Sequence, residues 1–319
     1  HFNASPQVGT LNIYYNSIFI SGNVSAGNDS SFAFFRERNT PLNLRNNILA
    51  NIRKGGTGNH YAVGLINNPT NYTASNNSLY TSNSSTVGLY LTDTYNFANW
   101  VSNSGETSSI NTNPLYHGVD NLKLLPNTPC YAAGTPVVGI TTDYYGVTRN
   151  VTLPTIGAVE VTDPLTPLAQ NTVNDPIAGD SVAILPIASQ GGLSMYFTSI
   201  PGAPSSYVTA QYYNSGRTGS FFGVTNISNY FWTIASDLNF FDASIRFYFN
   251  NIPSNGVLTP STLKLMHRTG PEATWVQWSE SLTNRFPNYI EITGVTGFSE
   301  FALGGNIDNS PFSIRIVFG

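Results

Sequence analysis

The feature that most constrains the fold of this 319-residue chain is a repeat of about 30 residues in its first half. An asparagine with an apolar residue two positions later recurs at Asn16, Asn46, Asn77 and Asn113. A second series of apolar runs begins at residues 31, 61 and 87. The units contain short β-type runs separated by Asn, Gly and Ser, without helical periodicity. This pattern predicts a parallel β-helix, in which each coil lays its strands on those of the previous coil.

The recurring asparagines are predicted to be structural. Asparagine tolerates left-handed backbone geometry at a corner, and its amide can stack on the asparagine of the next coil. The alternative for this half is a β-sandwich with hairpin turns every 8 to 12 residues, a spacing that does not produce a 30-residue register. The longest step, before Asn113, is expected to contain a short helix or a protruding loop between Thr92 and Glu106, around Trp100.

Composition limits the partners and the chemistry. Only 9% of the residues are charged and the net charge is −4, so neither nucleic acid nor membrane insertion is expected. Cys130 is the single cysteine, which excludes an intramolecular disulfide and predicts a buried thiol. The chain starts at His1 and has no recognisable signal peptide, so we expect it to be processed or part of a longer protein.

The end of the first half contains a series of short motifs. These are Asn113-Pro114-Leu115-Tyr116, Thr128-Pro129 with Gly134, Asp143-x-x-Gly146-x-x-Arg149, and Ile156-Gly157-Ala158 with Glu160. The series resembles the last coils of right-handed parallel β-helix repeat proteins secreted by bacteria. The resemblance implies that Asp143, Arg149 and Glu160 form a structural cap, in which Asp143 and Arg149 can join by a charge-assisted hydrogen bond.

The second half has strands of irregular spacing and is predicted to be a β-sandwich. In the run Ser244–Phe249, Ile245 and Phe247 face one way, and Arg246 and Tyr248 face the other. Its end resembles a module near the C-terminus of surface proteins exported by the type IX pathway. The expected organisation is all-β: residues 1–162 a right-handed parallel β-helix, 163–181 a linker, 182–305 a β-sandwich, and 306–319 a C-terminal strand or tail.

No sequence motif for catalysis, metal binding or a cofactor is present, so we expect no catalytic residues, no metal and no cofactor. Carbohydrate contacts are the remaining binding hypothesis. Arg38 and Arg53 could lie on neighbouring coils and bind an acidic sugar, or they could be solvated turn residues. Trp275 and Trp278 should face opposite sides of a strand, one in the core and the other able to stack on a sugar or to fill the surface.

Two functions follow as hypotheses. The first is an extracellular or cell-surface bacterial structural protein that binds copies of itself and forms a filament, through its first coil or through a donated C-terminal strand. The candidate assembly residues are Leu11, Ile13, Tyr15, Ile18, Phe312, Ile314, Ile316 and Phe318. The tail could equally fold back into its own sandwich. The second hypothesis is a secreted protein that binds or degrades polysaccharide, and a third possibility is the C-terminal part of a large adhesin.

Overall fold

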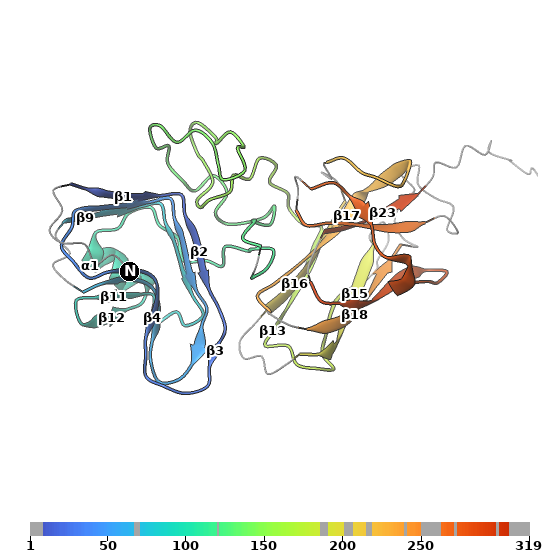
Figure 1. Ribbon diagram of the computed structural model, residues 1–319, viewed down its shortest axis with the longest axis horizontal. Helices are drawn as coiled ribbons and strands as arrows, with labels where there is room; N and C mark the ends of the chain where they lie inside the picture. Colours follow the sequence, from blue (N-terminus) through green and yellow to red (C-terminus); the bar gives the residue numbers. More distant parts are fainter. Residues whose placement is uncertain are drawn as a thin grey trace, which may run out of the picture.

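The computed structural model describes residues 9–66, 71–119, 121–185, 191–200, 207–214, 219–238, 241–249, 263–270, 273–297 and 300–305. It is all-β, with 47% strand and 5% helix in multiple sheets, as the sequence predicted. Its two halves lie side by side, with largely strand-free loops of residues 111–168 above and between them (Figure 1).

The strands of the first half are short. They are β1 (Leu11–Tyr14), β2 (Ser17–Ile20), β3 (Asn23–Val24), β4 (Ser31–Arg36), β5 (Leu42–Arg45), β6 (Ile48–Asn51), β7 (Lys54–Gly55), β8 (His60–Leu65), β9 (Tyr72–Ser75), β10 (Ser78–Thr81), β11 (Gly88–Tyr90) and β12 (Asp93–Tyr95). One helix, α1 (Phe97–Ser104), follows β12.

These strands form parallel sheets at the predicted period. The sheet orders are β1-β5-β9, β10-β6-β2 and β12-β11-β8-β4, with β3 and β7 as a further pair. Leu11 pairs with Leu42 and Leu42 with Tyr72, so the first sheet advances by 31 and then 30 residues. Within the described residues, β12 is the one strand of these sheets that pairs in an antiparallel direction, with β11. The 30-residue register is therefore confirmed as a pattern of parallel pairing.

The corner between the first and second sheets contains two residue series, which correct the predicted asparagine series. One series has left-handed geometry, with φ between 54° and 57°, and consists of Tyr15, Asn46, Asn76 and Ser108. The next residues, Asn16, Asn47, Asn77 and Ser109, form a ladder: the three amide side chains bond one another, and the main-chain N–H of Asn77 donates to Oγ of Ser109. The left-handed geometry and the stacked amide thus belong to adjacent residues. Asn46 belongs to the first series, and Ser109 takes the fourth ladder position that we had assigned to Asn113.

Apolar side chains from all three sheets meet inside the stacked units of about 30 residues, hereafter called coils. In β5, Leu42 and Leu44 are buried while the two residues between and after them are half-exposed, which is the alternation expected of a strand covered on one face. The segment around Trp100 is helical, which decides between the two predicted conformations. Trp100 is fully buried against the same core, so α1 is part of the packing rather than a protrusion.

The closing segment, residues 107–161, lies mainly along the side of the coils. Its Tyr116, Cys130 and Ile156 pack on the outer face of the second sheet, against Ile48 and Ala50. Its main chain also bonds the left-handed corner, where Asn46 exchanges two hydrogen bonds with Thr135. Cys130 is buried as predicted, and burial raises the pKa of its thiol to about 12.

Two antiparallel sheets form the second half. Their strands are β13 (Ala169–Asn174), β14 (Ser181–Ile184), β15 (Gly192–Ser199), β16 (Tyr207–Tyr213), β17 (Asn226–Ser236), β18 (Asp242–Tyr248), β19 (Lys264–Arg268), β20 (Val276–Gln277), β21 (Thr283–Arg285), β22 (Tyr289–Val295) and β23 (Glu300–Gly305), with a short 3-10 helix, η3 (Glu280–Leu282). The six-stranded sheet has the order β13-β16-β17-β23-β19-β20, and the five-stranded sheet has the order β14-β15-β18-β22-β21.

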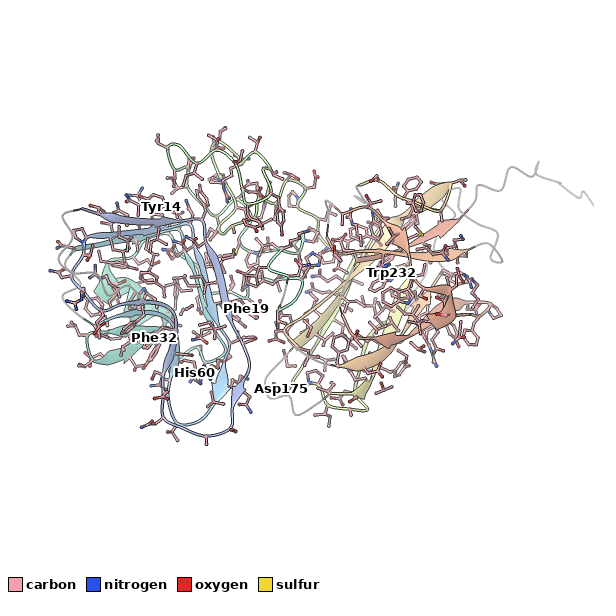
Figure 2. All side chains as sticks on the ribbon, in the orientation of Figure 1. Tyr14, Phe19, Phe32, His60, Asp175 and Trp232 are labelled. Atoms are coloured by element: carbon pink, nitrogen blue, oxygen red, sulfur yellow. The ribbon has the colours of Figure 1, made fainter. Side chains whose placement is uncertain are left out.

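The two sheets share one apolar core, in which Trp232 lies between them (Figure 2). In β18 the predicted alternation is confirmed, because Ile245 and Phe247 are buried while Arg246 and Tyr248 are half-exposed. The predicted linker is too long, because residues 169–174 form β13 and pair with β16. Its prolines precede and follow that strand, where a missing N–H costs nothing.

Candidate functional site

The first coil has an open edge within the described residues. β1, β2 and β4 each pair with one neighbouring strand, and the described chain supplies no strand on their other side. The N–H groups of Leu11 and Tyr15 bond the carbonyls of Pro41 and Arg45, on the β5 side. Because successive residues of a strand direct their main-chain groups to opposite edges, Asn12 and Tyr14 present theirs at the open edge, where the Tyr14 carbonyl also accepts from Nδ2 of Asn16.

Apolar side chains lie directly beneath this edge. Leu11, Ile13 and Ile18 are partly buried and pack on the core of the coils, whereas Tyr15 is buried at the corner. The structure therefore brings these four predicted assembly residues to one end of the first half. Phe312, Ile314, Ile316 and Phe318 lie outside the described residues, so the predicted tail strand stays a prediction.

The opposite end of the coils is covered by the chain itself. Thr107 and Ile110 bridge to the ends of β9 and β10, β12 covers the edge of β11, and α1 packs beside it. Trp100 donates a 2.6 Å hydrogen bond to the buried carboxylate of Glu106, which also accepts from Asn77. The two ends therefore differ, and stacking identical coils end to end would require this cover to move.

The predicted cap residues are close together, but their bonding differs from the prediction. Arg149 pairs with Glu160 at 3.3 Å, with both side chains almost completely buried. Asp143 instead accepts hydrogen bonds from three main-chain N–H groups, those of Tyr145, Val147 and Glu160. Carboxylate-to-amide bonds stabilise the loop that holds Arg149, so Asp143 positions the arginine indirectly.

Burial and hydrogen bonding oppose each other in this cluster. Burial lowers the pKa of Arg149 and raises that of Glu160, while the N–H groups of Asn150 and Thr155 act against the shift at Glu160. The guanidinium lies 3.9 Å from the ring centroid of Tyr15, so the cluster is also fixed to the first coil. These contacts join residues 143–160 to the corner of the coils.

Arg38 and Arg53 are not brought together. Arg38 is exposed in the turn between β4 and β5, at a different corner from Arg53, which lies between β6 and β7. Arg53 instead lines a pocket of about 260 Å³ with Lys54, His60 and Asn83. Arg38 is therefore not part of a site with Arg53. The residues that lie beside Arg53 are Lys54, His60 and Asn83.

The two tryptophans lie on opposite sides of their strand, as predicted. Trp275 is fully buried in the cluster on the outer face of the six-stranded sheet, so its ring has no free face for a sugar. Trp278 packs against the core between the sheets. Both indoles thus contribute to packing, which corrects the proposed sugar contact at Trp275.

A row of aromatic residues on the outer face of the five-stranded sheet was not selected from the sequence. The Arg246 guanidinium lies 5.3 Å from the ring centroid of Tyr196 and 5.4 Å from that of Tyr289. Phe286 stacks on Tyr289 at 4.4 Å, and Glu291 bonds Arg246 at 2.7 Å. The alternation in β18 predicts that Arg246 faces outward. Which aromatic residues lie beside it depends on how β15 and β22 pair with β18, and the sequence pattern does not predict that register.

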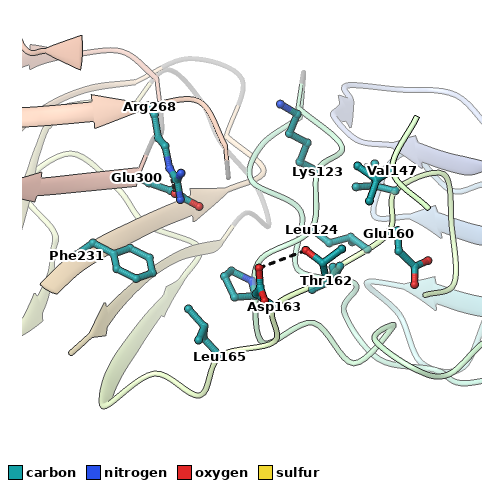
Figure 3. Close-up of a pocket in the computed structure, with 13 residues that line it drawn as sticks. Lys123, Leu124, Val147, Glu160, Thr162, Asp163, Leu165, Phe231, Arg268 and Glu300 are labelled. Carbon is teal, nitrogen blue, oxygen red and sulfur yellow. Dashed lines mark hydrogen bonds and ion pairs between the residues drawn. The ribbon is translucent and has the colours of Figure 1, made fainter. Parts of the chain in front are cut away.

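A second pocket, of about 190 Å³, lies between the halves of the molecule (Figure 3). Lys123 and Glu160 line it from the first half, and Arg268 and Glu300 line it from the second. Arg268 bonds Glu300 at 2.5 Å, and Nε2 of His117 lies 3.7 Å from the same carboxylate. Burial lowers the pKa of His117 to about 3, so this histidine is neutral at pH 7.

The sequence pattern did not predict the residues of this junction, because no repeat connects them. His117, Arg268 and Glu300 come from distant segments. The one available signal in the sequence was Glu300, a charged residue next to the apolar run that begins at Phe301. Direct bonds also cross the junction, including that from Nδ2 of Asn121 to the carbonyl of Thr269. These contacts join the two halves of the molecule.

Within the described ranges, no group of three or more His, Cys, Asp or Glu side chains is placed to hold a metal ion. No helix in that part of the chain is long and apolar enough to cross a membrane. Comparisons with models of protein families, with curated proteins and with solved structures found no significant match.

Proposed function

We propose that the first half is a short right-handed parallel β-helix and the second half a β-sandwich, as at the end of secreted bacterial surface proteins. The parallel registers support the first assignment, and the common core of two antiparallel sheets supports the second. Gly146 and Gly157 of the closing motif have φ values of 83° and 98°, a region that favours glycine. This agreement supports the resemblance on which an extracellular location rests.

We further propose that the protein is a structural subunit that assembles through the open edge of its first coil. The observation that carries this proposal is the row of outward main-chain groups on β1 above the half-buried Leu11 and Ile13. An unpaired edge over apolar side chains is a template for another strand. Because the far end is covered, the partner strand we propose is residues 312–318 of a second copy, whose sequence alternates between apolar and other residues.

Substituting the edge of β1 tests this assembly. Asn12→Pro removes one outward N–H while leaving the groups that face β5, and proline is tolerated at such edges. Asn12→Ala is the matched control, because it removes the same side-chain bonds to Tyr14 and Asn43 but keeps the N–H. We expect assemblies of the unmodified protein and of Asn12→Ala, measured by light scattering and negative-stain microscopy, and monomers of Asn12→Pro.

Removing residues 310–319 tests the donated strand in the same assay. The truncated chain should be monomeric, and an added peptide of residues 310–319 should bind it but not its Asn12→Pro form. Assemblies unchanged by truncation would contradict strand donation. A chain that is monomeric at every concentration would refute the assembly proposal as a whole.

The second candidate function is binding of polysaccharide, either by the protein alone or as part of a large adhesin. The aromatic row Tyr196, Tyr289 and Phe286 favours it, with Tyr196 and Phe286 each 40% exposed. Partly exposed rings beside a charged hydrogen-bonding pair are suited to the apolar faces and hydroxyls of sugars. Tyr196→Ala tests this function, because it removes one ring of the row and should weaken the binding of polysaccharide measured by calorimetry.

A further inference from the structure

We propose that the pocket at the corner of the second and third coils binds the anionic group of an acidic polysaccharide, such as a uronate or a sulfate ester. Arg53 and Lys54 would supply the charge, and Ser82 and Asn83 of the next coil would supply further donors. This inference rests on the second candidate function and names its ligand class. It also replaces the pairing of Arg38 with Arg53 that the sequence suggested.

The pocket is formed by turns that stack on one another. One wall is the turn from Arg53 to His60, which includes β7, and the other is the loop after β10 that contains Ser82, Asn83 and Thr86. His60 marks this corner of the coils in Figure 2. The volume of about 260 Å³ is close to the lower limit of about 300 Å³ for small-molecule sites. It suits one sugar unit of a longer chain that continues outside.

The charge of the pocket is of one sign. Arg53 and Lys54 are half-buried, and the lining contains no aspartate or glutamate. Within the described residues, neither cation forms an ion pair. Burial raises the pKa of the Asp237 carboxyl, and the Lys54 charge acts against that shift, so the two groups interact electrostatically. Two adjacent cations in a concave site attract an anion more strongly than the same charges on a flat surface.

The walls are held in place before any ligand binds. His60 has both ring nitrogens occupied, with Nδ1 2.9 Å from Oγ of Ser31 and Nε2 3.2 Å from the carbonyl of Gly55. At Gly55 the backbone has a φ of 82°, and an added Cβ would lie 2.2 Å from Oδ1 of Asn23. This turn is therefore fixed against the previous coil, and both ring nitrogens of His60 help to hold it there.

Donors remain for an oxyanion on the other wall. Oδ1 of Asn83 accepts from the N–H of Ser85, and Thr86 donates to main-chain carbonyls. In the described structure, Nδ2 of Asn83 and the hydroxyl of Ser82 bond no protein acceptor. Charged and neutral donors thus line one pocket, the combination that recognises a carboxylate or sulfate.

The choice of an acidic polysaccharide follows from the rest of the molecule. The whole chain has 13 Lys and Arg residues against 17 Asp and Glu, so its net charge of −4 provides no overall attraction for a densely charged nucleic acid. A glycan with one anionic group per sugar needs only a local pair of cations. Its neutral hydroxyls suit the Asn, Ser and Thr of the surrounding turns.

Binding measurements on the full chain test this site. Polygalacturonate, a sulfated galactan and neutral dextran are titrated by calorimetry at low and at moderate salt. The main comparison is between the unmodified chain and Arg53→Gln, which lacks one of the two pocket cations. The double variant Arg53→Gln/Lys54→Gln lacks both. Arg38→Gln is the matched control, because it removes the same charge at another corner. Thermal melting checks that each variant is folded, since Lys54 also influences Asp237.

We expect an acidic polymer to bind more tightly than dextran, about tenfold weaker binding for Arg53→Gln, and a change of less than about twofold for Arg38→Gln. Binding of polygalacturonate alone identifies a uronate, and binding of the galactan alone identifies a sulfate ester. Equal losses in Arg53→Gln and Arg38→Gln would overturn the pocket. Binding lost only in Tyr196→Ala would overturn the pocket but support polysaccharide binding by the aromatic row. If the chain binds none of the polymers, both the proposed pocket and the polysaccharide-binding function are overturned.

Discussion

At the scale of single residues, the corner of the coils depends on amides that bond in several directions at once. Oδ1 of Asn47 accepts from the main-chain N–H of Asn16, while its Nδ2 donates to the carbonyls of Ile13 and Arg45. Asn47 is fully buried, so water cannot replace these partners. One side chain therefore satisfies main-chain groups on two coils, which explains why an asparagine recurs here with the period of the coils.

We predict that Asn47→Ala lowers the free energy of unfolding of the first half by about 2–4 kcal/mol, because it leaves buried polar groups without partners. Asn43→Ala, which removes a half-exposed amide from β5, should change it by less than about 0.5 kcal/mol. Three of the four tryptophans lie in the second half, so amide hydrogen exchange of β5 and β6 at a series of urea concentrations is used to report on the first half separately. Equal effects of the two substitutions would show that the ladder adds nothing to stability.

At the scale of elements, α1 closes the end of a core that the sheets leave open. Asn96 caps its first turn by accepting from the N–H of Asn99, and Gly105 ends it with a φ of 72°. Between them, Trp100 lies over β11, where a Cβ on Gly88 would come within 2.0 Å of the indole. The glycine in β11 is thus required by the helix that covers it.

We predict that Trp100→Ala destabilises the first half by about 3–5 kcal/mol, since it opens a cavity and removes the hydrogen bond to Glu106. Ser102→Ala, on the exposed face of α1, is the control and should change stability by less than about 0.5 kcal/mol. Urea unfolding followed by circular dichroism measures both. If Trp100→Ala costs as little as the control, α1 does not seal the coils.

At the scale of the whole molecule, ionisable groups are buried where the halves meet. Burial raises the pKa of Asp237 to about 7, although the N–H of Tyr207 bonds this carboxylate at 2.6 Å. Asp237 belongs to the second half, but the charge of Lys54 in the first half lowers its pKa. In turn, the Asp237 charge contributes to the raised pKa of Tyr80 in β10. Titration of Asp237 is therefore linked to the contact between the halves.

The sign of this linkage follows from the direction of the shift. Because the pKa of Asp237 is higher in the folded protein than its usual 3.8, folding favours the protonated form. Its contribution to stability is fully present below about pH 4 and is lost as the pH rises through about 7. We predict that Asp237→Asn matches the unmodified protein near pH 4 and is more stable at pH 8 by roughly 2–4 kcal/mol. Urea unfolding at a series of pH values checks this, and parallel curves for the two proteins would contradict it.

The sequence alone determined the all-β class, the parallel 30-residue register of the first half and the inward face of β18. These properties are periodic, because parallel strands stack at a constant number of residues per coil and strand side chains alternate in direction. The sequence did not show which asparagine of the corner has left-handed geometry and which forms the hydrogen-bond ladder, because Asn46 and Asn47 are adjacent residues of the same type.

Only the tertiary structure decided the contacts between segments that no period relates. It paired Arg149 with Glu160 rather than with Asp143, and it placed Arg53 beside Asn83 rather than beside Arg38. Each of these contacts depends on how irregular loops cross the coils, and it is fixed by burial and hydrogen bonding over the whole fold. A repeating sequence pattern predicts which residues pair between neighbouring coils. The candidate sites instead depend on contacts between distant segments, and these contacts do not repeat along the chain.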